Sequence, residues 1–539
     1  MQVLGLEMTP PHSRTLFELL REQAERFPGR IAVICGERQA TYRDLADAAV
    51  RIAAALRAAG FRRGEGIGLL INNRLEWLEA CFGAAALGIM VVPFSTWSKP
   101  DELAYLLADS EITALFAVNT FAGQNFAETL SILAPNSPRL RQIVILGGEF
   151  QPGWIGYEAF RSSHAPLAEL PSGEAADGAD DALILYTSGS SARPKAVRLQ
   201  HYAVIENGFA IGGRMGLTPD DRVLLAPPLF WAYGATNALP ATLTHGATLV
   251  LQGRFDAGEW LGLIERHRCT AVYTLPSITG AALRHPDFRG ERVRSLRTGL
   301  MIGSPEEVRV AAEDLGARQI CNIYGSTEVY GNCCVTPCDW PLDRRMHSQG
   351  PPLPGVTLRI VDPESGRVLP SGESGAVEVA GYVTPGYAGA SAAHNPTAFT
   401  ADGYFRTGDL GLVDDVGDFQ FVARDADIIK RAGINVSPAE IESLLLQHPA
   451  VAQAAVVGAI AGERGEAIVA FVVPRPGAEI DGGALREHCR ALASSYKVPD
   501  RVEIRAALPV TETGKLFRRA LKDEAQALIG RQVGSSSGS

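Results

Sequence analysis

One tract of the sequence combines hydroxyl side chains, a glycine and a lysine as a phosphate-binding loop does. It extends over residues 186–195 and follows the apolar run at 182–185, which predicts a strand. In such a loop, backbone N–H groups and hydroxyls converge on phosphate oxygens while the lysine supplies positive charge. The residues that could bind phosphate in this way are Thr187, Ser188, Gly189, Ser190, Ser191 and Lys195.

The spacing of this tract differs from that of the P-loop in kinases and ATPases. No second glycine precedes Lys195, and no Ser or Thr follows it to hold a magnesium ion. Taken alone, the tract also fits a solvated Ser/Gly linker. Other segments must therefore decide between a phosphate loop and a linker.

Four downstream segments favour the phosphate loop, because together with it they resemble the motifs of a known superfamily. Residues 322–328, 404–409, 424–433 and 509–515 are similar to the Y-G-x-T-E, T-G-D, hinge and P-x-T-x-x-G-K motifs of adenylate-forming enzymes. That superfamily contains acyl-CoA synthetases, luciferases and nonribosomal adenylation domains, and residues 186–195 resemble its signature loop. Five motifs in the correct order, together with the entry patterns at residues 41–45 and 63–66, cover nearly the whole chain. The sequence is thus identified as a member, of the acyl-CoA synthetase (AMP-dependent synthetase and ligase) type.

This resemblance implies a two-step reaction. A carboxylate attacks the α-phosphate of ATP and displaces pyrophosphate, and the acyl-AMP then accepts the thiol of coenzyme A. The implied enzyme is an AMP-forming acid–thiol ligase that uses ATP, Mg²⁺ and coenzyme A. Negative charges meet in the first step, so catalysis requires well-placed cations. The implied catalytic residues are Thr327, Glu328, Lys430 and Lys515, with Glu328 and Thr187 as magnesium ligands.

The resemblance also assigns residues to the nucleotide. Asp409 and Arg424 would bind the ribose hydroxyls, since a carboxylate accepts and a guanidinium donates hydrogen bonds there. Tyr324 would lie near the adenine and the α-phosphate. The backbone that would border the adenine is that of Gly303, Ser304 and Pro305.

The second step implies a rotation of the C-terminal module, because one site must first surround ATP and then admit a thiol. Lys430 would then approach the active site, Gly433 would let the pantetheine arm pass, and Asn435 would assist. The sequence departs from the family at the hinge, where Ala426 replaces an Asp or Lys. In the phosphate loop, Ser191, Ala192 and Ala196 replace Thr, Gly and Gly.

Residues 228–234 resemble the P-L-F-H-x-x-G motif that borders the acyl pocket, with Trp231 in place of the histidine. The residues that would border this pocket are mostly apolar or small, so a hydrophobic carboxylic acid is expected. No acidic residue stands where an amino-acid ammonium group would need a partner, which argues against an amino-acid-activating domain. Fatty, aromatic and polycyclic acids remain open. The expected pocket residues are Phe230, Trp231, Tyr233, Gly234, Leu275, Gly299, Ile302, Tyr330 and Gly331.

The composition restricts the partners and the compartment. The chain has 539 residues, 46% of them hydrophobic, and a net charge of −10, which argues against nucleic acid or an anionic membrane as a partner. No secretory signal is evident, so a cytoplasmic protein is expected. The uncharged stretch at 80–94 is better explained by a buried helix and strand than by a membrane span. A homodimer remains open.

The pattern of apolar runs and helical segments predicts an α/β fold. A large N-terminal domain, residues 1–424, should contain two α/β halves with parallel sheets and a small β-barrel-like subdomain after about residue 351. A small α+β domain, which the resemblance implies to be mobile, should follow at residues 425–533, and residues 534–539 read as a flexible tail.

Three alternatives share the same motifs. The acceptor could be an acyl carrier protein instead of free coenzyme A. A luciferase-like oxygenase would need a substrate that can be oxidised at its α-carbon. A catalytically silent regulator is disfavoured, because the chain retains all the charged residues expected to act: Lys195, Glu328, Asp409, Arg424, Lys430 and Lys515.

Overall fold

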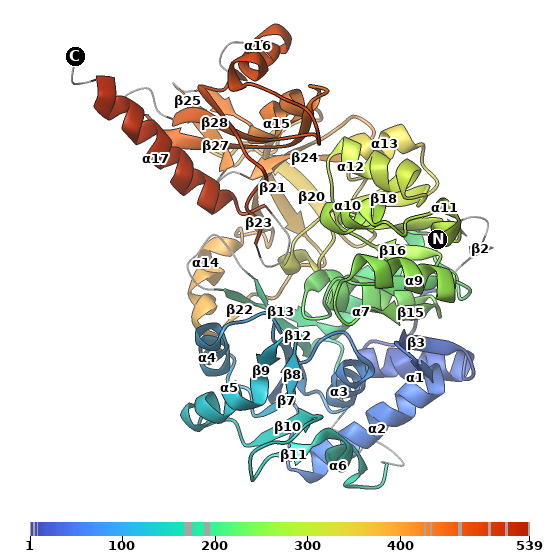
Figure 1. The fold of residues 1–539 in the computed structure, drawn as a ribbon. Coiled ribbons are helices and arrows are strands. Elements are labelled where there is room, and N and C mark those ends of the chain that lie inside the picture. The colour runs from blue at the N-terminus through green and yellow to red at the C-terminus, as the bar shows by residue number, and fades with distance from the viewer. Residues whose placement is uncertain are drawn as a thin grey trace. The chain divides into compact units, whose positions relative to one another are not determined.

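The computed structural model describes residues 9–166, 175–187, 194–424, 427–431, 434–461, 466–493, 497–511 and 516–536, and the strands β1 (Gln2–Val3) and β2 (Leu6–Glu7). The chain divides into two compact units (Figure 1). The first comprises Met1–Leu358, Glu378–Arg406 and Val416–Phe419. The second comprises Arg359–Val377, Thr407–Asp415 and Gln420–Ser539.

The first unit contains two large sheets, as the alternation of strands and helices predicts. One sheet has the strand order β11-β10-β7-β5-β6-β12-β13-β22. Its strands from β11 to β12 run parallel, and β13 and β22 are antiparallel additions. The bounds are β5 Gly66–Leu70, β6 Met90–Pro93, β7 Ala114–Val118, β10 Gln142–Leu146, β11 Ile155–Gly156, β12 Asp181–Thr187, β13 Lys195–Gln200 and β22 Tyr387–Ala388.

The second sheet has the order β19-β18-β17-β16-β14-β15-β3-β4, and its strands from β18 to β3 run parallel. It therefore includes a hairpin, β3 and β4, that precedes the whole first sheet in the sequence. The bounds are β3 Ile31–Cys35, β4 Arg38–Thr41, β14 Arg222–Leu225, β15 Thr248–Leu251, β16 Ala271–Tyr273, β17 Thr298–Met301, β18 Gln319–Tyr324 and β19 Cys334–Val335. A short hairpin is formed by β8 Thr120–Phe121 and β9 Gln124–Asn125.

Helices connect the parallel strands, which require crossovers. In the first unit they are α1 Leu16–Arg26, α2 Tyr42–Ala58, α3 Leu75–Ala86, α4 Pro100–Asp109, α5 Phe126–Leu133, α6 Tyr157–Ser162, α7 His201–Arg214, α8 Leu239–Thr244, α9 Ala257–His267, α10 Pro276–Arg284, α11 Gly290–Val293, α12 Pro305–Arg309, α13 Leu342–His347 and α14 Asn395–Ala398. Short helical turns are η1 Ala134–Asn136, η2 Tyr233–Ala238, η3 Val310–Asp314, η4 Thr327–Val329 and η5 Gly389–His394.

Local sequence explains where individual helices begin and how closely they pack. Thr41 and Asp44 form a reciprocal capping box at the start of α2, which satisfies backbone N–H groups that lack a partner within the helix. Helix α2 packs on α3, and a Cβ atom at Gly83 would lie 2.6 Å from Ile52. Glycine at position 83 is therefore required by this close approach. The expected buried helix and strand within residues 80–94 are confirmed as α3 and β6.

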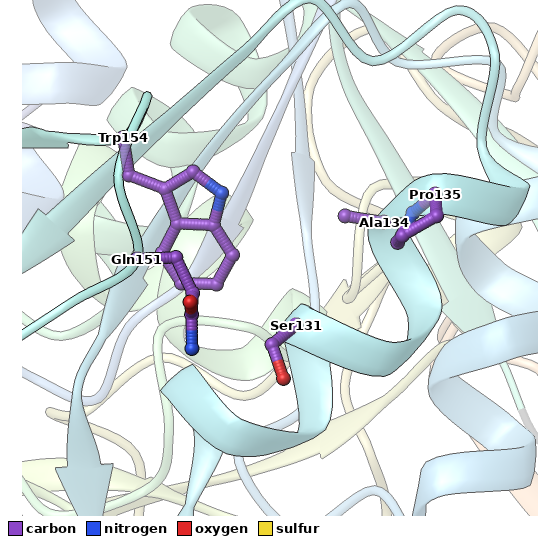
Figure 2. A pocket seen from close by; sticks show the side chains of 5 residues that line it. All are labelled: Ser131, Ala134, Pro135, Gln151 and Trp154. Atoms are coloured by element: carbon purple, nitrogen blue, oxygen red, sulfur yellow. The ribbon is translucent and has the colours of Figure 1, made fainter.

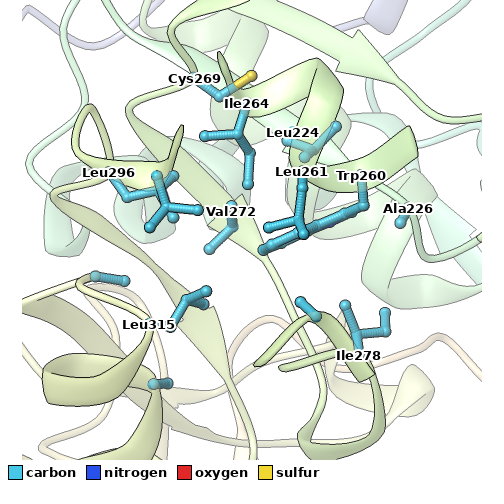
Figure 3. Close-up of a cluster of buried hydrophobic side chains, with 14 of the residues drawn as sticks. Leu224, Ala226, Trp260, Leu261, Ile264, Cys269, Val272, Ile278, Leu296 and Leu315 are labelled. Atoms are coloured by element: carbon cyan, nitrogen blue, oxygen red, sulfur yellow. The ribbon is translucent and has the colours of Figure 1, made fainter. Parts of the chain in front are cut away.

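An apolar core supports one face of the second sheet (Figure 3). Side chains of β14 and β16, such as Leu224 and Val272, pack there with Trp260 and Ile264 of α9 and with Ile278 of α10. Burial of such side chains contributes about 1.5–3 kcal/mol each. This core fixes the strands whose carboxyl ends carry the motifs described below.

The second unit contains the expected small C-terminal α+β module. Its three-stranded sheet has the order β27-β28-β29 and is accompanied by the hairpin β25–β26. The bounds are β25 Ile429–Arg431, β26 Ile434–Val436, α15 Pro438–Leu446, β27 Val451–Ile460, β28 Glu466–Pro474, α16 Gly482–Leu492, β29 Arg501–Ile504 and α17 Arg518–Ser536. A separate four-stranded sheet has the order β20-β21-β23-β24, with bounds β20 Thr357–Val361, β21 Gly375–Ala380, β23 Phe405–Val413 and β24 Phe419–Arg424.

Among the helices of the described ranges, none combines the length and the apolar composition needed to cross a membrane.

Candidate active site

The motif residues of the first unit gather at the carboxyl ends of neighbouring parallel strands. Residues 228–234 follow β14, Leu275 follows β16, Gly303 follows β17, and residues 325–331 follow β18. These strands are adjacent in the order β18-β17-β16-β14. Open α/β sheets bind ligands at this edge, since the loops there converge. The sequence alone does not show that these four strands are neighbours.

The loop after β18 is tightly constrained. Thr327 and Glu328 lie in the single turn η4, and Tyr330 has a left-handed backbone with φ of 59°. Gly331 also has a positive φ, 93°, and a Cβ atom there would lie 2.4 Å from the Asn237 side chain. Non-glycine residues adopt this conformation rarely and at a cost, and such strain is concentrated at functional sites. The constraint fixes the direction in which Glu328 projects.

Glu328 is connected to the segment that contains β22. The Tyr387 hydroxyl donates a hydrogen bond to Glu328 Oε1 at 3.1 Å, and the backbone N–H of Thr384 donates to the Glu328 carbonyl at 2.7 Å. Burial and the neighbouring carboxylate raise the pKa of Tyr387, so its phenol stays protonated and remains a donor. Lys195 Nζ lies 5.1 Å from the centre of the Tyr387 ring, within cation–π range. Tyr387 thus contacts both the carboxylate and the lysine that the sequence singles out.

The phosphate tract joins two antiparallel strands. Thr187, the last residue of β12, pairs directly with Lys195, the first residue of β13. The structure therefore places one hydroxyl and the lysine side by side at the end of a hairpin. The expected phosphate ligands Ser188, Gly189, Ser190 and Ser191 lie outside the described residues.

The donor chemistry around Glu328 fits magnesium held jointly with phosphate. Within the described ranges, no three or more His, Cys, Asp or Glu side chains form a group that could hold a metal ion by themselves. Magnesium prefers oxygen ligands and is commonly bound by one or two carboxylates together with substrate phosphates. Glu328 offers such a carboxylate, and the Thr187 hydroxyl offers a further oxygen in the same unit.

Four other expected nucleotide residues have clear structural surroundings. The Tyr324 ring is buried, with its centre 4.4 Å from that of Phe419. Ser304 is the N-cap of α12 and forms a capping box with Glu307, while Pro305 occupies the first turn. Gly303 lies directly before this cap. The backbone here is thus held rigidly, which is consistent with a wall of a nucleotide pocket.

Aromatic side chains cluster beside the 228–234 segment. Trp97, in the loop after β6, meets Phe230 edge to face with ring centres 5.2 Å apart, and it meets Trp231 at 5.1 Å. The ring centres of Phe230 and Trp231 lie 6.2 Å apart. The buried Asn73 fixes the approach to this segment by accepting a hydrogen bond from Leu229 N–H and donating one to Pro227. Trp97 and Asn73 follow strands β6 and β5 of the first sheet. The sequence analysis therefore did not connect them with this segment of the second sheet.

The remaining expected pocket residues differ in their surroundings. Tyr233 and Gly234 lie in η2, a π-helical turn of a kind that is frequent at functional sites. The Tyr233 hydroxyl donates to Thr274 and Leu300 carbonyls, and a Cβ atom at Gly299 would lie 2.3 Å from the Val272 carbonyl oxygen.

Two of the expected pocket residues, Ile302 and Tyr330, differ strongly in solvent exposure. Ile302 is 47% exposed, and Tyr330 is fully buried. The Tyr330 hydroxyl accepts a hydrogen bond from Gln200 N–H, and its carbonyl accepts bonds from Asn207 and Asn237. These contacts assign Tyr330 to holding the Glu328 loop in place.

In the second unit, the expected ribose ligands face one another. The Arg424 guanidinium lies 3.5 Å from Asp409 Oδ1, and the Asp409 carboxylate is largely buried. Lys430 and Asn435 are directly paired in the backbone ladder of β25 and β26. The side chains of these two residues, together with Gly433, Lys515 and the hinge residue Ala426, lie outside the described part of the chain.

A cavity of about 400 Å³ lies elsewhere in the first unit (Figure 2). It is lined by Ser131, Ala134, Pro135, Gln151 and Trp154, from α5, η1 and the loop before β11. None of the residues named in the motifs lines this cavity, so it is separate from the candidate active site.

Comparison with known proteins agrees with the motif assignment. Residues 20–388 match the model of the AMP-binding enzyme family, and residues 440–515 match that of the AMP-binding enzyme C-terminal domain. A feruloyl-CoA synthase from Amycolatopsis sp. is 33% identical over 503 residues, covering 92% of this chain and 96% of that protein. The mitochondrial medium-chain acyl-CoA ligase ACSF2 of Danio rerio is 28% identical, covering 98% and 91%.

A solved structure supports the same relationship. The anthranilate CoA ligase AuaEII in complex with anthranoyl-AMP superposes with a TM-score of 0.85 at 27% identity, covering 96% of this chain and 99% of that one. The family match spans more than half of the chain and includes the loop, Glu328 and Tyr387. The chain therefore belongs to the AMP-binding enzymes of the adenylate-forming superfamily.

Proposed function

We propose that this protein is an AMP-forming acyl-CoA synthetase that activates a hydrophobic carboxylic acid with ATP and transfers the acyl group to coenzyme A. The observation that carries the proposal is the grouping of Thr187, Lys195, Tyr387 and Glu328 next to the convergent strand ends. A lysine and a hydroxyl suit a phosphate, and a carboxylate suits the magnesium that accompanies it.

The chain's own residues supply positioning and charge. Lys195 and Thr187 bind phosphate oxygens at the end of the β12–β13 hairpin, and Asp409 with Arg424 binds the ribose. Glu328, held by Tyr387, is the carboxylate ligand for Mg²⁺, which when bound neutralises phosphate charge. Lys515 neutralises the charge that develops as the substrate carboxylate meets the α-phosphate. Lys430 acts in thioester formation after the C-terminal module has rotated.

Coenzyme A is our proposed acceptor, since the compared relatives are named as CoA ligases or synthases. An acyl carrier protein is the alternative that a test should include. We place the reaction in the cytoplasm, and a homodimer remains a proposal from the sequence. Pyrophosphate release across a panel of fatty, aromatic and polycyclic acids, with and without coenzyme A, tests the assignment. Release that requires an acid and rises with coenzyme A supports it, and inactivity with every acid contradicts it.

Compact, ring-bearing acids are our first candidates within the hydrophobic class. The relatives' names include both an aromatic and a medium-chain substrate, so they do not decide the question. Trp97, Phe230 and Trp231 fill space with mutually perpendicular rings beside the expected pocket. Aromatic side chains pack favourably against further rings, edge to face or offset, whereas a long chain would have to pass them.

Replacing Trp97 by alanine should therefore change substrate preference. The lost indole opens space for longer acids and removes ring contacts, so kcat/KM for a ring-bearing acid relative to a long-chain acid should fall about 10-fold or more. The KM for ATP should stay unchanged, because the ring contacts of Trp97 are with Phe230 and Trp231 of the expected acyl pocket. Competition assays with paired acids measure the ratio. An unchanged ratio would exclude Trp97 from the pocket wall.

A further inference from the structure

The last residue of helix α4, Asp109, connects two segments that are far apart in the sequence. The Tyr186 hydroxyl donates a hydrogen bond to Asp109 Oδ2 at 2.7 Å. The backbone N–H of Ala390 donates to the other oxygen, Oδ1, at 2.9 Å. One carboxylate therefore holds both the end of β12 and the start of η5. Figure 1 shows α4 beside α14, the helix that directly follows η5.

The position of Asp109 is not explained by the needs of its own helix. A negative charge at the carboxyl end of a helix is disfavoured by the helix dipole, whereas Asp101 and Glu102 in the first turn of α4 are favoured. Gly389 approaches so closely that a Cβ atom there would lie 2.5 Å from Asp109 Oδ2. A carboxylate that is unfavourable for its own helix but accepts two directed hydrogen bonds from other segments indicates a role beyond α4.

Both segments held by Asp109 lead to the candidate active site. Tyr186 precedes Thr187, which pairs with Lys195 across the hairpin. On the other side, Ser391 Oγ in η5 accepts a hydrogen bond from Ala196 N–H at 2.9 Å. The adjoining β22 pairs with β13 and carries Tyr387, which donates to Glu328. Asp109 thus accepts a hydrogen bond from each of the two segments that determine the position of Lys195 relative to Glu328.

The Tyr186 hydroxyl is a dependable donor in this arrangement. Its hydrogen bond to Asp109 Oδ2 is short, at 2.7 Å. The Tyr105 ring packs against that of Tyr186 edge to face, with centres 6.5 Å apart. The hydroxyl is therefore held in one direction by packing as well as by its acceptor.

We propose that Asp109 is a positioning residue for MgATP, which holds Thr187 and Lys195 of the β12–β13 hairpin in register with Tyr387 and Glu328. The inference rests on the proposed function, since it assumes that these residues bind the nucleotide. Asp109 itself contacts neither the acid nor the nucleotide in this assignment. Its loss should weaken ATP binding and leave the acid site intact.

The test compares Asp109→Asn and Tyr186→Phe with Asp101→Asn, a control at the other end of the same helix. Calorimetric titration with MgATP alone should show about 10-fold weaker binding for the first two variants, since small displacements of positioning groups have large effects. The control should bind as the wild type does. In turnover assays, the KM for ATP should rise and the KM for the acid should stay the same. The double variant should lose no more than the larger single loss, because both changes break one interaction.

Several results would overturn the inference. They are unchanged MgATP binding in Tyr186→Phe, an equal rise in both KM values, or losses that multiply in the double variant. If Asp109→Asn fails to fold, Tyr186→Phe decides alone, because it removes only one hydroxyl. A wild-type protein that binds MgATP but turns over no acid would count against the proposed function, and the binding comparison would still decide the role of Asp109.

Discussion

Replacing Lys515 by alanine should lower acid-dependent ATP–pyrophosphate exchange by about 10²–10³-fold, while pre-formed acyl-AMP is still converted to thioester. The effect should be this large because one charge that stabilises a transition state in a water-excluded site contributes about 3–4 kcal/mol. Adenylation brings a carboxylate and a phosphate together, so loss of the cation should lower the rate of that step most. Exchange of labelled pyrophosphate measures the first half-reaction, and acyl-CoA formed from synthetic acyl-AMP measures the second.

Lys430→Ala is the matched variant for this experiment, since it removes the same charge from the residue assigned to the other half-reaction. It should leave exchange largely intact and slow thioester formation. The two variants together should show opposite patterns. Equal loss of both half-reactions in either variant would contradict the division of roles between Lys515 and Lys430.

Replacing Glu328 by glutamine should lower the rate of adenylation by about 10²-fold or more at ordinary magnesium concentrations. Glutamine keeps the shape of the side chain and an oxygen that can accept the Tyr387 hydrogen bond. It removes the negative charge, and Mg²⁺ is bound chiefly through carboxylates and phosphates. The concentration of magnesium needed for half-maximal exchange should therefore rise, and excess magnesium should restore part of the rate.

Glu265→Gln is a suitable control, because this exposed glutamate of α9 pairs with Arg292 on the surface and such pairs contribute little. It should show the wild-type magnesium requirement. Melting temperatures of both variants separate a change in magnesium binding from a change in folding. A Glu328→Gln variant with unaltered magnesium dependence would remove Glu328 from the list of metal ligands.

Much of the architecture follows from the sequence, because apolar periodicity reports local structure. Strand β12 and the buried helix α3 with strand β6 appear where the pattern predicts them. The assignment of strands to sheets does not follow in the same way. The hairpin β3–β4 joins the second sheet although it precedes the first, because strand pairing depends on contacts distant in sequence.

The residues of the candidate site likewise divide into those that sequence motifs indicate and those that only tertiary contacts reveal. Thr187, Lys195 and Glu328 stand in recognisable motifs, so their chemical roles could be predicted. Tyr387 could not be predicted, since an isolated tyrosine carries no pattern, and only the pairing of β22 with β13 brings it to Glu328. Asp109 was missed for a related reason. On sequence alone it is an ordinary aspartate at the end of a helix.

Tyr330 shows how a motif position can serve the scaffold. Its place two residues after Glu328 suggested a pocket wall, yet its hydroxyl and carbonyl are engaged by Gln200, Asn207 and Asn237. Buried polar groups need hydrogen-bond partners, and these partners come from β13, α7 and η2. The positive φ of Tyr330 is a backbone property that the side-chain pattern does not reveal.

The central claim is that a carboxylate oxygen of the substrate attacks the α-phosphate of ATP. The most direct measurement uses an acid from the active panel labelled with ¹⁸O in both carboxylate oxygens. Attack forms a bond between that oxygen and phosphorus, and transfer to coenzyme A then breaks the bond between carbon and the same oxygen. Mass spectrometry should therefore find one ¹⁸O atom in each AMP released. AMP without the label would contradict acyl-adenylate formation.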